Sequence, residues 1–229
     1  MTVKERVESV RERIAAAALR VGRDPGEVLL VAVAKTFPAS AVEKVIAAGI
    51  NDIGENRVQE AKAKIADIKA PCHWHMVGHL QTNKARLAAR LFDWIQSLDS
   101  AKLAQELQKA GSGLGKRLRT LIEVNLEQEP TKSGVTEAEL FSLLEEASAL
   151  PNLSIEGLMA MPPYDPNPET VRPYFRRLRR LRDEAASRFP QLDLSHVSMG
   201  MSHDFEVAVE EGATIVRIGT AIFGERPPQ

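Results

Sequence analysis

The sequence predicts an α/β fold, a single (β/α)8 TIM barrel that spans residues 1–229 and carries an extra helix at its amino end. Eight short apolar segments of β-strand character alternate with amphipathic helical segments, which indicates parallel strands joined by right-handed crossovers. An open, doubly wound sheet would place a glycine-rich fingerprint after the first strand, but the chain has Lys35–Thr36–Phe37–Pro38 there. No linker or change of composition marks a second domain.

The extra helix is expected over residues 1–21, packed on the barrel. Thr2 and Glu5 form a capping box at its start, and charged residues separate its apolar positions. These charges exclude the uninterrupted apolar core of a secretory signal peptide. The apolar stripe consists of Val7, Val10, Ile14, Ala17 and Val21.

The remaining strands follow from apolar runs bounded by turn residues, and the helices follow from apolar positions at helical spacing. Gly49 and Gly111 are expected to end helices. Thr136 is expected to start one, with Glu139 completing a second capping box. The predicted strands are Val28–Ala34, Asp52–Ile53, His73–Val77, Trp94–Ser97, Thr120–Asn125, Ser154–Met159, His196–Ser198 and Ile215–Ile218. The predicted helices are Ser40–Ala48, Arg57–Ile68, Asn83–Leu91, Ala101–Ala110, Glu137–Leu150, Glu169–Phe189 and Asp204–Glu211.

The composition excludes several classes of protein. The net charge of −1 gives no field that would draw the chain to nucleic acid or to anionic lipid, and no segment has the apolar length of a membrane span. Cys72 is the only cysteine, which excludes an internal disulfide and fits a reducing cytosol. The sequence therefore predicts a soluble, cytoplasmic monomer that binds neither membranes nor nucleic acid.

The basic segment Arg172–Arg182 is the one stretch that looks like a nucleic-acid patch. Its apolar residues recur at helical spacing, so the arginines are interpreted as the solvated face of a helix. These apolar residues, with one that follows the segment, are Tyr174, Leu178, Leu181 and Ala185.

Lys35 is the first candidate functional residue, because it follows an apolar strand bounded by Pro25–Gly26 and Pro38. An ammonium at the end of a buried strand is costly unless it is paired, exposed in a cleft or neutral. A desolvated lysine of lowered pKa is the amine that captures a carbonyl carbon as a Schiff base. The alternative is a lysine whose stem extends into water.

Two short loops after the seventh and eighth strands combine glycine with a hydroxyl residue, where barrels commonly bind phosphate. The loops are Ser198–Met199–Gly200–Met201–Ser202 and Gly219–Thr220. Glycine lets the backbone approach a ligand, and amides at the start of a helix bind anions. Either Ser202 or Thr220 alone would be an ordinary N-cap, but both together favour phosphate. A lysine and a phosphate cradle suit a phosphorylated aldehyde, with pyridoxal 5′-phosphate (PLP) as the leading candidate and a sugar-phosphate aldol substrate as the second.

Three further features lie near this predicted site at the carboxyl-terminal ends of the strands. Arg217, near the end of the last strand, would pair with the phosphate or a ring nitrogen if it points inward, or with a helix carboxylate if it points outward. Asn56 either forms a wall of the pocket or caps the following helix. His73, His75 and His79 are not joined by other ligands at metal-binding spacing, so no metal is predicted and their role stays open.

Five segments, in order over nearly the whole chain, resemble the signature blocks of the pyridoxal phosphate homeostasis protein family. Two departures are Ala34, where the family often has serine, and Arg57, where it often has an aromatic residue. Neither alters the lysine or the phosphate loops. The segments are Val33–Thr36, Gly54–Glu60, His75–Lys84, Ser198–Ser202 and Val216–Gly224.

The resemblance implies a barrel similar to the N-terminal domain of alanine racemase, with PLP bound as a Schiff base to Lys35. It implies that Arg217 faces the pyridine nitrogen and that Asn56 lies beside the ring. The phosphate would be held by Ser202, Gly219 and Thr220, in a loop shaped by Met199, Gly200 and Met201. It also implies a carrier or regulator of cellular PLP without established turnover, with PLP-dependent apo-enzymes as recipients.

Two considerations weigh against catalysis. Racemisation needs a second acid/base on the opposite face of the substrate, and in the racemases it comes from a separate domain for which this chain has no room. An arginine at the ring nitrogen also weakens the cofactor as an electron sink. We therefore expect a non-catalytic PLP-binding protein. The alternatives are a racemase-like PLP enzyme with Lys35 as its base, and a cofactor-free Schiff-base aldolase.

Overall fold

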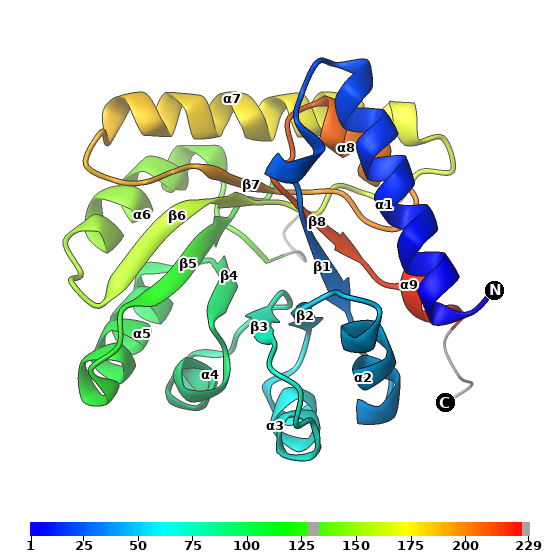
Figure 1. Ribbon diagram of the computed structural model, residues 1–229. Helices are drawn as coiled ribbons and strands as arrows, with labels where there is room; N and C mark the ends of the chain where they lie inside the picture. The colour runs from blue at the N-terminus through cyan, green and yellow to red at the C-terminus, as the bar shows by residue number, and fades with distance from the viewer. Residues whose placement is uncertain (128–132, 226–229) are drawn as a thin grey trace.

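The structure, a computed structural model that describes residues 1–127 and 133–225, confirms the predicted barrel (Figure 1). Its strands are all parallel and follow one another around the ring in chain order, and the last strand closes the ring by pairing with the first. The strands are β1 (Leu29–Val33), β2 (Asp52–Glu55), β3 (His73–Met76), β4 (Trp94–Leu98), β5 (Leu118–Glu123), β6 (Leu153–Met159), β7 (His196–Ser198) and β8 (Ile215–Ile218).

Helices surround the ring, and the apolar side chains between helices and strands form the main core. Short 3-10 helices lie at Pro25–Glu27, Thr82–Lys84 and Pro168–Val171. No described helix is long and apolar enough to cross a membrane. The helices are α1 (Val3–Arg20), α2 (Ala39–Ala47), α3 (Val58–Asp67), α4 (Ala85–Leu91), α5 (Ala101–Leu114), α6 (Glu137–Ser148), α7 (Arg172–Arg188), α8 (Phe205–Glu210) and α9 (Thr220–Phe223).

Helix α1 is the extra helix that the sequence predicts, and it lies on the outside of the barrel along α8 and α9 (Figure 1). Its capping box between Thr2 and Glu5 is present. The Arg6 Nε donates to the carbonyl oxygen of Ile222 at 2.6 Å, so the first helix is tied to the last one. Val21, predicted in the apolar stripe, instead follows the last helical residue and is 46% exposed.

Two predicted details are wrong. Helix α5 continues through Gly111 and ends before Gly115, whose φ of +62° is the left-handed conformation that ends helices. Gly111 is needed for packing instead, since a Cβ there would lie 3.0 Å from the Cβ of Asn152. In α7 the buried aromatic residue is Phe175, whereas Tyr174 is only partly buried.

Arginines in the first part of α7 pair with carboxylates of neighbouring elements, whereas Arg179 and Arg188 pair with acidic residues of α7 itself. Arg172 contacts Glu169, Glu210 and Glu211 at 2.6–2.7 Å, and this set of hydrogen bonds raises the pKa of the arginine. Arg177 pairs with Glu137 of α6. Ion pairs of the first basic residues therefore join this helix to its neighbours.

The interior of the barrel is partly polar, which the strand alternation alone did not reveal. One part is an apolar cluster built around Val31, Trp94 and Leu121. Barrels of this class are normally filled by bulky apolar layers, so buried polar groups inside the ring point to a functional constraint. These buried polar residues include His75, Gln96, Ser198 and Arg217.

Candidate functional site

Lys35 lies two residues beyond β1 and is half-buried at the carboxyl-terminal mouth of the barrel. The loop after β8 lies against the end of β1, because a Cβ on Gly219 would lie 3.5 Å from the carbonyl oxygen of Val33. The topology thus brings the candidate amine and one of the two candidate phosphate loops to the same side of the mouth.

The backbone directly after Lys35 is strained. Thr36 has a φ of +69°, the only positive φ of a non-glycine residue in the described chain, and β-branched residues strongly disfavour this region. Such a conformation costs roughly 1–3 kcal/mol and persists only where its surroundings enforce it. Here the Phe37 amide donates to the carbonyl of Ala34 at 3.1 Å, which closes a tight turn around Lys35.

A buried ion pair supports this turn from below. The ammonium of Lys64, on α3, contacts the carboxylate of Glu55 and donates to the carbonyl oxygen of Ala34 at 2.7 Å. Burial raises the pKa of Glu55, whose side chain is fully buried. Lys64 was not predicted as a site residue, although a lysine on the apolar side of an amphipathic helix was the available signal.

The loops after β7 and β8 are joined by one hydroxyl group. The Ser202 Oγ accepts hydrogen bonds from the amides of Gly219 at 3.1 Å and Ala221 at 3.3 Å. Asp204 holds the N-cap position of α8 without a side-chain capping hydrogen bond, and Thr220 is the first residue of α9, so neither Ser202 nor Thr220 is an ordinary N-cap of its own helix. Hydroxyl and amide groups gathered in this way are suited to an anion.

Gly200 fixes the shape of the loop after β7. Its carbonyl oxygen accepts from the Arg217 amide at 3.0 Å, and its φ is +92°. A Cβ at this position would lie 2.6 Å from the Cβ of Ala208 on α8. Met199 is fully buried, and the Met201 amide donates to the Asp204 carboxylate at 2.6 Å.

Replacing Gly200 by Ala is expected to lower the free energy of unfolding by about 2–4 kcal/mol, because the positive φ and the overlap with Ala208 both oppose a side chain. Denaturant unfolding would measure the change. The control is Gly113→Ala in α5, where nothing lies within 4 Å of the new Cβ and the expected change is a gain of about 0.5–1 kcal/mol. Equal stabilities of the two variants would contradict this account of the loop.

Arg217 points into the barrel, which decides between the two orientations that the sequence left open. Its side chain is buried, and Nη1 donates to Ser198 Oγ at 2.6 Å while Nη2 donates to the Ala160 carbonyl at 2.9 Å. Burial lowers the pKa of Arg217 to about 10, with Glu123 and Asp204 acting in the opposite direction. The guanidinium therefore stays protonated at neutral pH.

Asn56 follows β2 and contributes to the same mouth. It does not cap α3, whose N-cap position is Arg57 without a side-chain hydrogen bond. Gly78 allows the approach of the next loop, because a Cβ there would lie 2.6 Å from the Asn56 carbonyl oxygen. A cavity of about 390 Å³ opens here, lined by Asn56 together with His79, Lys84 and neighbouring residues.

The three histidines serve different contacts. His73 and His75 both contact the Asp52 carboxylate, whereas His79 Nδ1 lies 2.9 Å from an oxygen of Asp99. Among residues 1–127 and 133–225 no group of three or more potential ligands is arranged to hold a metal ion.

Two other contacts at the mouth were not predicted. Glu123, at the end of β5, accepts from Ser133 Oγ at 2.8 Å, and burial raises its pKa. His203, next to Ser202, lies 2.5 Å from the Asp165 carbonyl oxygen and packs on the Tyr164 ring, which joins the loop after β6 to the loop after β7. Single residues in irregular loops gave no periodic signal from which these contacts could be predicted.

The donor set at this mouth fits a phosphorylated aromatic aldehyde. Lys35 supplies an amine, the Ser202 and Thr220 hydroxyl groups with nearby amides suit a phosphate, and Arg217 supplies a buried cation. The requirement for glycine at position 200 lets the loop after β7 pack closely against α8.

The chain is similar to known proteins over almost its whole length. Residues 7–227 match the family model described as the N-terminal domain of alanine racemase. The pyridoxal phosphate homeostasis protein of Aquifex aeolicus is 47% identical over 227 residues, 99% of each chain, and that of Escherichia coli K12 is 42% identical over 231 residues, 98% of this chain and 97% of the relative.

Solved structures give the same result. PipY of Synechococcus elongatus, determined with PLP bound, is 40% identical with a TM-score of 0.83 and covers 94% of this chain and 100% of its own. An alanine racemase of Clostridium difficile, 13% identical with a TM-score of 0.74, matches 100% of this chain and 58% of its own, which shows a shared fold.

Proposed function

This chain belongs to the pyridoxal phosphate homeostasis protein family, and from that premise we propose that it binds PLP as a Schiff base on Lys35. Its role is to hold and release the cofactor in the cytoplasm, as a monomer, with PLP-dependent apo-enzymes as recipients. The observation that carries the proposal is the meeting of Lys35, the two loops joined by Ser202, and inward-facing Arg217 at one barrel mouth.

Each predicted residue has a defined task in this proposal. The Lys35 amine condenses with the aldehyde and releases one water, which is the covalent chemistry that an aldehyde cofactor supplies. Ser202, Gly219 and Thr220 bind the phosphate, and Arg217 faces the ring nitrogen. Asn56 lies beside the ring, while Met199, Gly200 and Met201 hold the phosphate loop in shape.

The state of Arg217 favours a carrier over an enzyme. With a pKa of about 10 this residue is a donor at neutral pH, so a ring nitrogen facing it accepts a hydrogen bond and stays unprotonated. An unprotonated ring withdraws electrons weakly and gives little stabilisation to a carbanion. Binding and release are therefore supported better than turnover of amino acids.

The test is the visible spectrum of the purified protein with PLP, before and after borohydride, followed by peptide mapping. We expect a yellow band that borohydride removes, with a pyridoxyl group on the peptide that carries Lys35. Lys64 is an internal control, because its amine is buried and paired with Glu55. A label on Lys64, or a protein that stays colourless and unmodified, would contradict the proposal. Deuterium wash-in at the α-carbon of amino acids would instead indicate a racemase-like enzyme.

A further inference from the structure

A chain of buried hydrogen bonds crosses the inside of the barrel and ends at Arg217. Arg217 Nη1 lies 2.6 Å from Ser198 Oγ, which lies 2.7 Å from Gln96 Oε1. Gln96 Nε2 lies 3.0 Å from His75 Nδ1, and His75 Nε2 lies 3.0 Å from Asp52 Oδ1. The members come from β8, β7, β4, β3 and β2, and all except Asp52 are buried.

The direction of every hydrogen bond in this chain is fixed by its two ends. A guanidinium can only donate, so the Ser198 hydroxyl accepts from Arg217 and must give its single hydrogen to Gln96 Oε1. The Gln96 amide group then donates to His75 Nδ1, which must be unprotonated. The remaining proton of the ring sits on Nε2 and is donated to Asp52, a carboxylate that can only accept.

The ionisation of the far end agrees with this direction. Burial lowers the pKa of His75, which favours the neutral ring that the chain needs. Burial by itself would raise the pKa of Asp52, but its hydrogen-bond contacts with His75 and His73 outweigh this and lower that pKa, so the carboxylate stays ionised.

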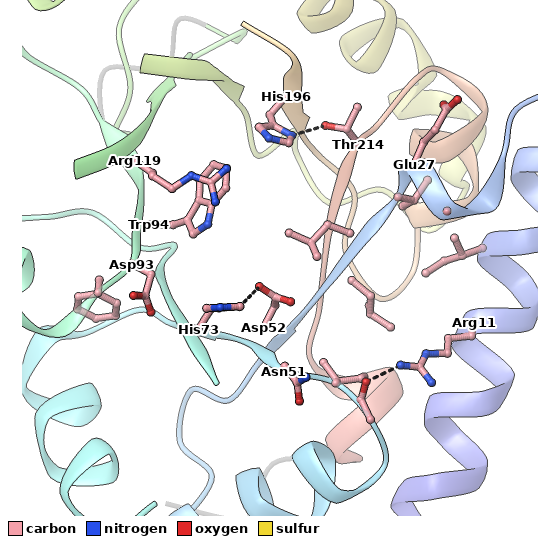
Figure 2. Close-up of a pocket in the computed structure, with 18 of the residues that line it drawn as sticks. Arg11, Glu27, Asn51, Asp52, His73, Asp93, Trp94, Arg119, His196 and Thr214 are labelled. Atoms are coloured by element: carbon pink, nitrogen blue, oxygen red, sulfur yellow. Dashed lines mark hydrogen bonds and ion pairs between the residues drawn. The ribbon is translucent and has the colours of Figure 1, made fainter. Parts of the chain in front are cut away.

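The far end reaches the opposite face of the molecule. Asp52 is the first residue of β2 and lines a cavity of about 1060 Å³ at the amino-terminal ends of the strands. Figure 2 shows Asp52 and His73 side by side in this cavity, across from Trp94, Arg119 and His196. His73 contacts the same Asp52 oxygen at 3.4 Å, but its side chain is 66% exposed and it lies outside the chain of donors.

We propose that Asp52, His75, Gln96 and Ser198 are positioning residues that hold the Arg217 guanidinium in one orientation toward the cofactor ring from the opposite face of the barrel. The proposal rests on the proposed function for its cofactor, but the hydrogen-bond direction is a property of the protein alone. If the direction of the hydrogen bonds were reversed, the Ser198 hydroxyl would accept from both Gln96 and Arg217. Its own hydrogen would then lose Gln96 Oε1 as its acceptor, so a single arrangement is enforced.

The first experiment needs no cofactor. Long-range proton–nitrogen NMR spectra of the PLP-free full-length protein report which ring nitrogen of His75 carries the proton. We expect a neutral ring protonated on Nε2. A ring protonated on Nδ1, or on both nitrogens at neutral pH, would overturn the proposal whether or not the protein binds PLP.

The second experiment uses Gln96→Leu, which removes the central link. We expect its PLP affinity to fall about ten- to a hundredfold, the effect of a weakened hydrogen bond to a charged group, and the visible band of bound PLP to shift. Thr120→Val is the matched control, because the Thr120 hydroxyl is also buried in the barrel wall but donates only to the Leu118 carbonyl at 3.1 Å. This control is expected to keep both the affinity and the band.

Asp52→Ala covers the case in which Gln96→Leu fails to fold, and His73→Ala is its control at the same carboxylate. Asp52→Ala should leave the His75 Nε2 proton without its carboxylate acceptor, change the ring nitrogen signals of His75 and shift the PLP band, whereas His73→Ala should do neither. Unchanged affinity and spectra in both chain variants, with wild-type protein that binds PLP, would overturn the positioning role. A wild-type protein that fails to bind PLP would overturn the proposed function instead and leave the NMR result decisive.

Discussion

Replacing Lys35 by Ala is expected to abolish borohydride-dependent labelling and to weaken PLP binding by at least about a hundredfold. The variant retains the buried Arg217 and the proposed phosphate-binding residues Ser202 and Gly219, so weak binding through the phosphate should persist without the yellow band. Absorbance titration with PLP and mass spectrometry after borohydride would measure both effects.

Lys35→Arg separates covalent capture from charge. Arginine keeps a cation beside the two proposed phosphate-binding loops, but its guanidinium stays protonated and does not form a Schiff base. It should show no label, yet bind PLP more tightly than Lys35→Ala does. A yellow band of wild-type strength in Lys35→Ala would remove Lys35 from its proposed role.

The second large effect is expected at the buried ion pair below the Lys35 turn. Replacing Lys64 by Met removes the cation but leaves the fully buried carboxylate of Glu55 without its partner. Breaking a buried pair in this way costs about 3–5 kcal/mol of unfolding free energy. The Ala34 carbonyl also loses a donor, so the turn before Lys35 should loosen and PLP affinity should fall with stability.

The pH dependence of Lys64→Met gives a sign that can be checked. Burial already raises the pKa of Glu55 above its ordinary value, and removal of the cation raises it further. A carboxyl group whose pKa is higher in the folded state binds more protons there than in the unfolded state. Its protonation therefore stabilises the folded state, and this stabilisation is complete at pH values below the ordinary pKa of the carboxyl group. This contribution is lost as the pH rises through the raised pKa.

Denaturant unfolding from about pH 8 to about pH 4 should therefore show Lys64→Met recovering stability toward acid relative to the wild type. The double variant with Glu55→Gln removes the uncompensated charge and should regain most of the loss, leaving a pH-independent difference. A Lys64→Met protein as stable as the wild type at pH 8 would show that the ion pair does not stabilise the fold around the Lys35 turn.

The fold was predictable because its signals are repeated along the chain. Each strand and helix is marked by its own apolar pattern, and the two capping boxes at Thr2 and Thr136 are present where expected. Element ends were less certain, since Gly111 shows that a glycine can serve packing inside a helix rather than end it. Strand β2 was predicted too short, because its last two residues are recognised as strand only from their pairing with β1 and β3.

The site was predictable only where a residue type carries its chemistry by itself. Lys35, Ser202 and Arg217 combine an unusual side chain with a place at a strand end, which is visible in the sequence. The orientation of the Arg217 side chain is not visible in the sequence. Which residues of β8 point into the barrel becomes clear only when β8 is paired with β1 in register. Partners such as Lys64 and Gln96 act through contacts between distant strands and helices, and no local pattern records such contacts.

The closure of the ring by β8 against β1 has a consequence for how the protein is made. During synthesis β1 emerges early and keeps an unpaired edge until β8 is complete, and Gly219 and Thr220 follow β8 directly. Arg6 of α1 meets its Ile222 partner only at that point. Nascent chains arrested before β8 should therefore aggregate through the unpaired strand edge and be unable to bind the cofactor. Cofactor binding by ribosome-bound chains would then identify those that have been translated through the last strand.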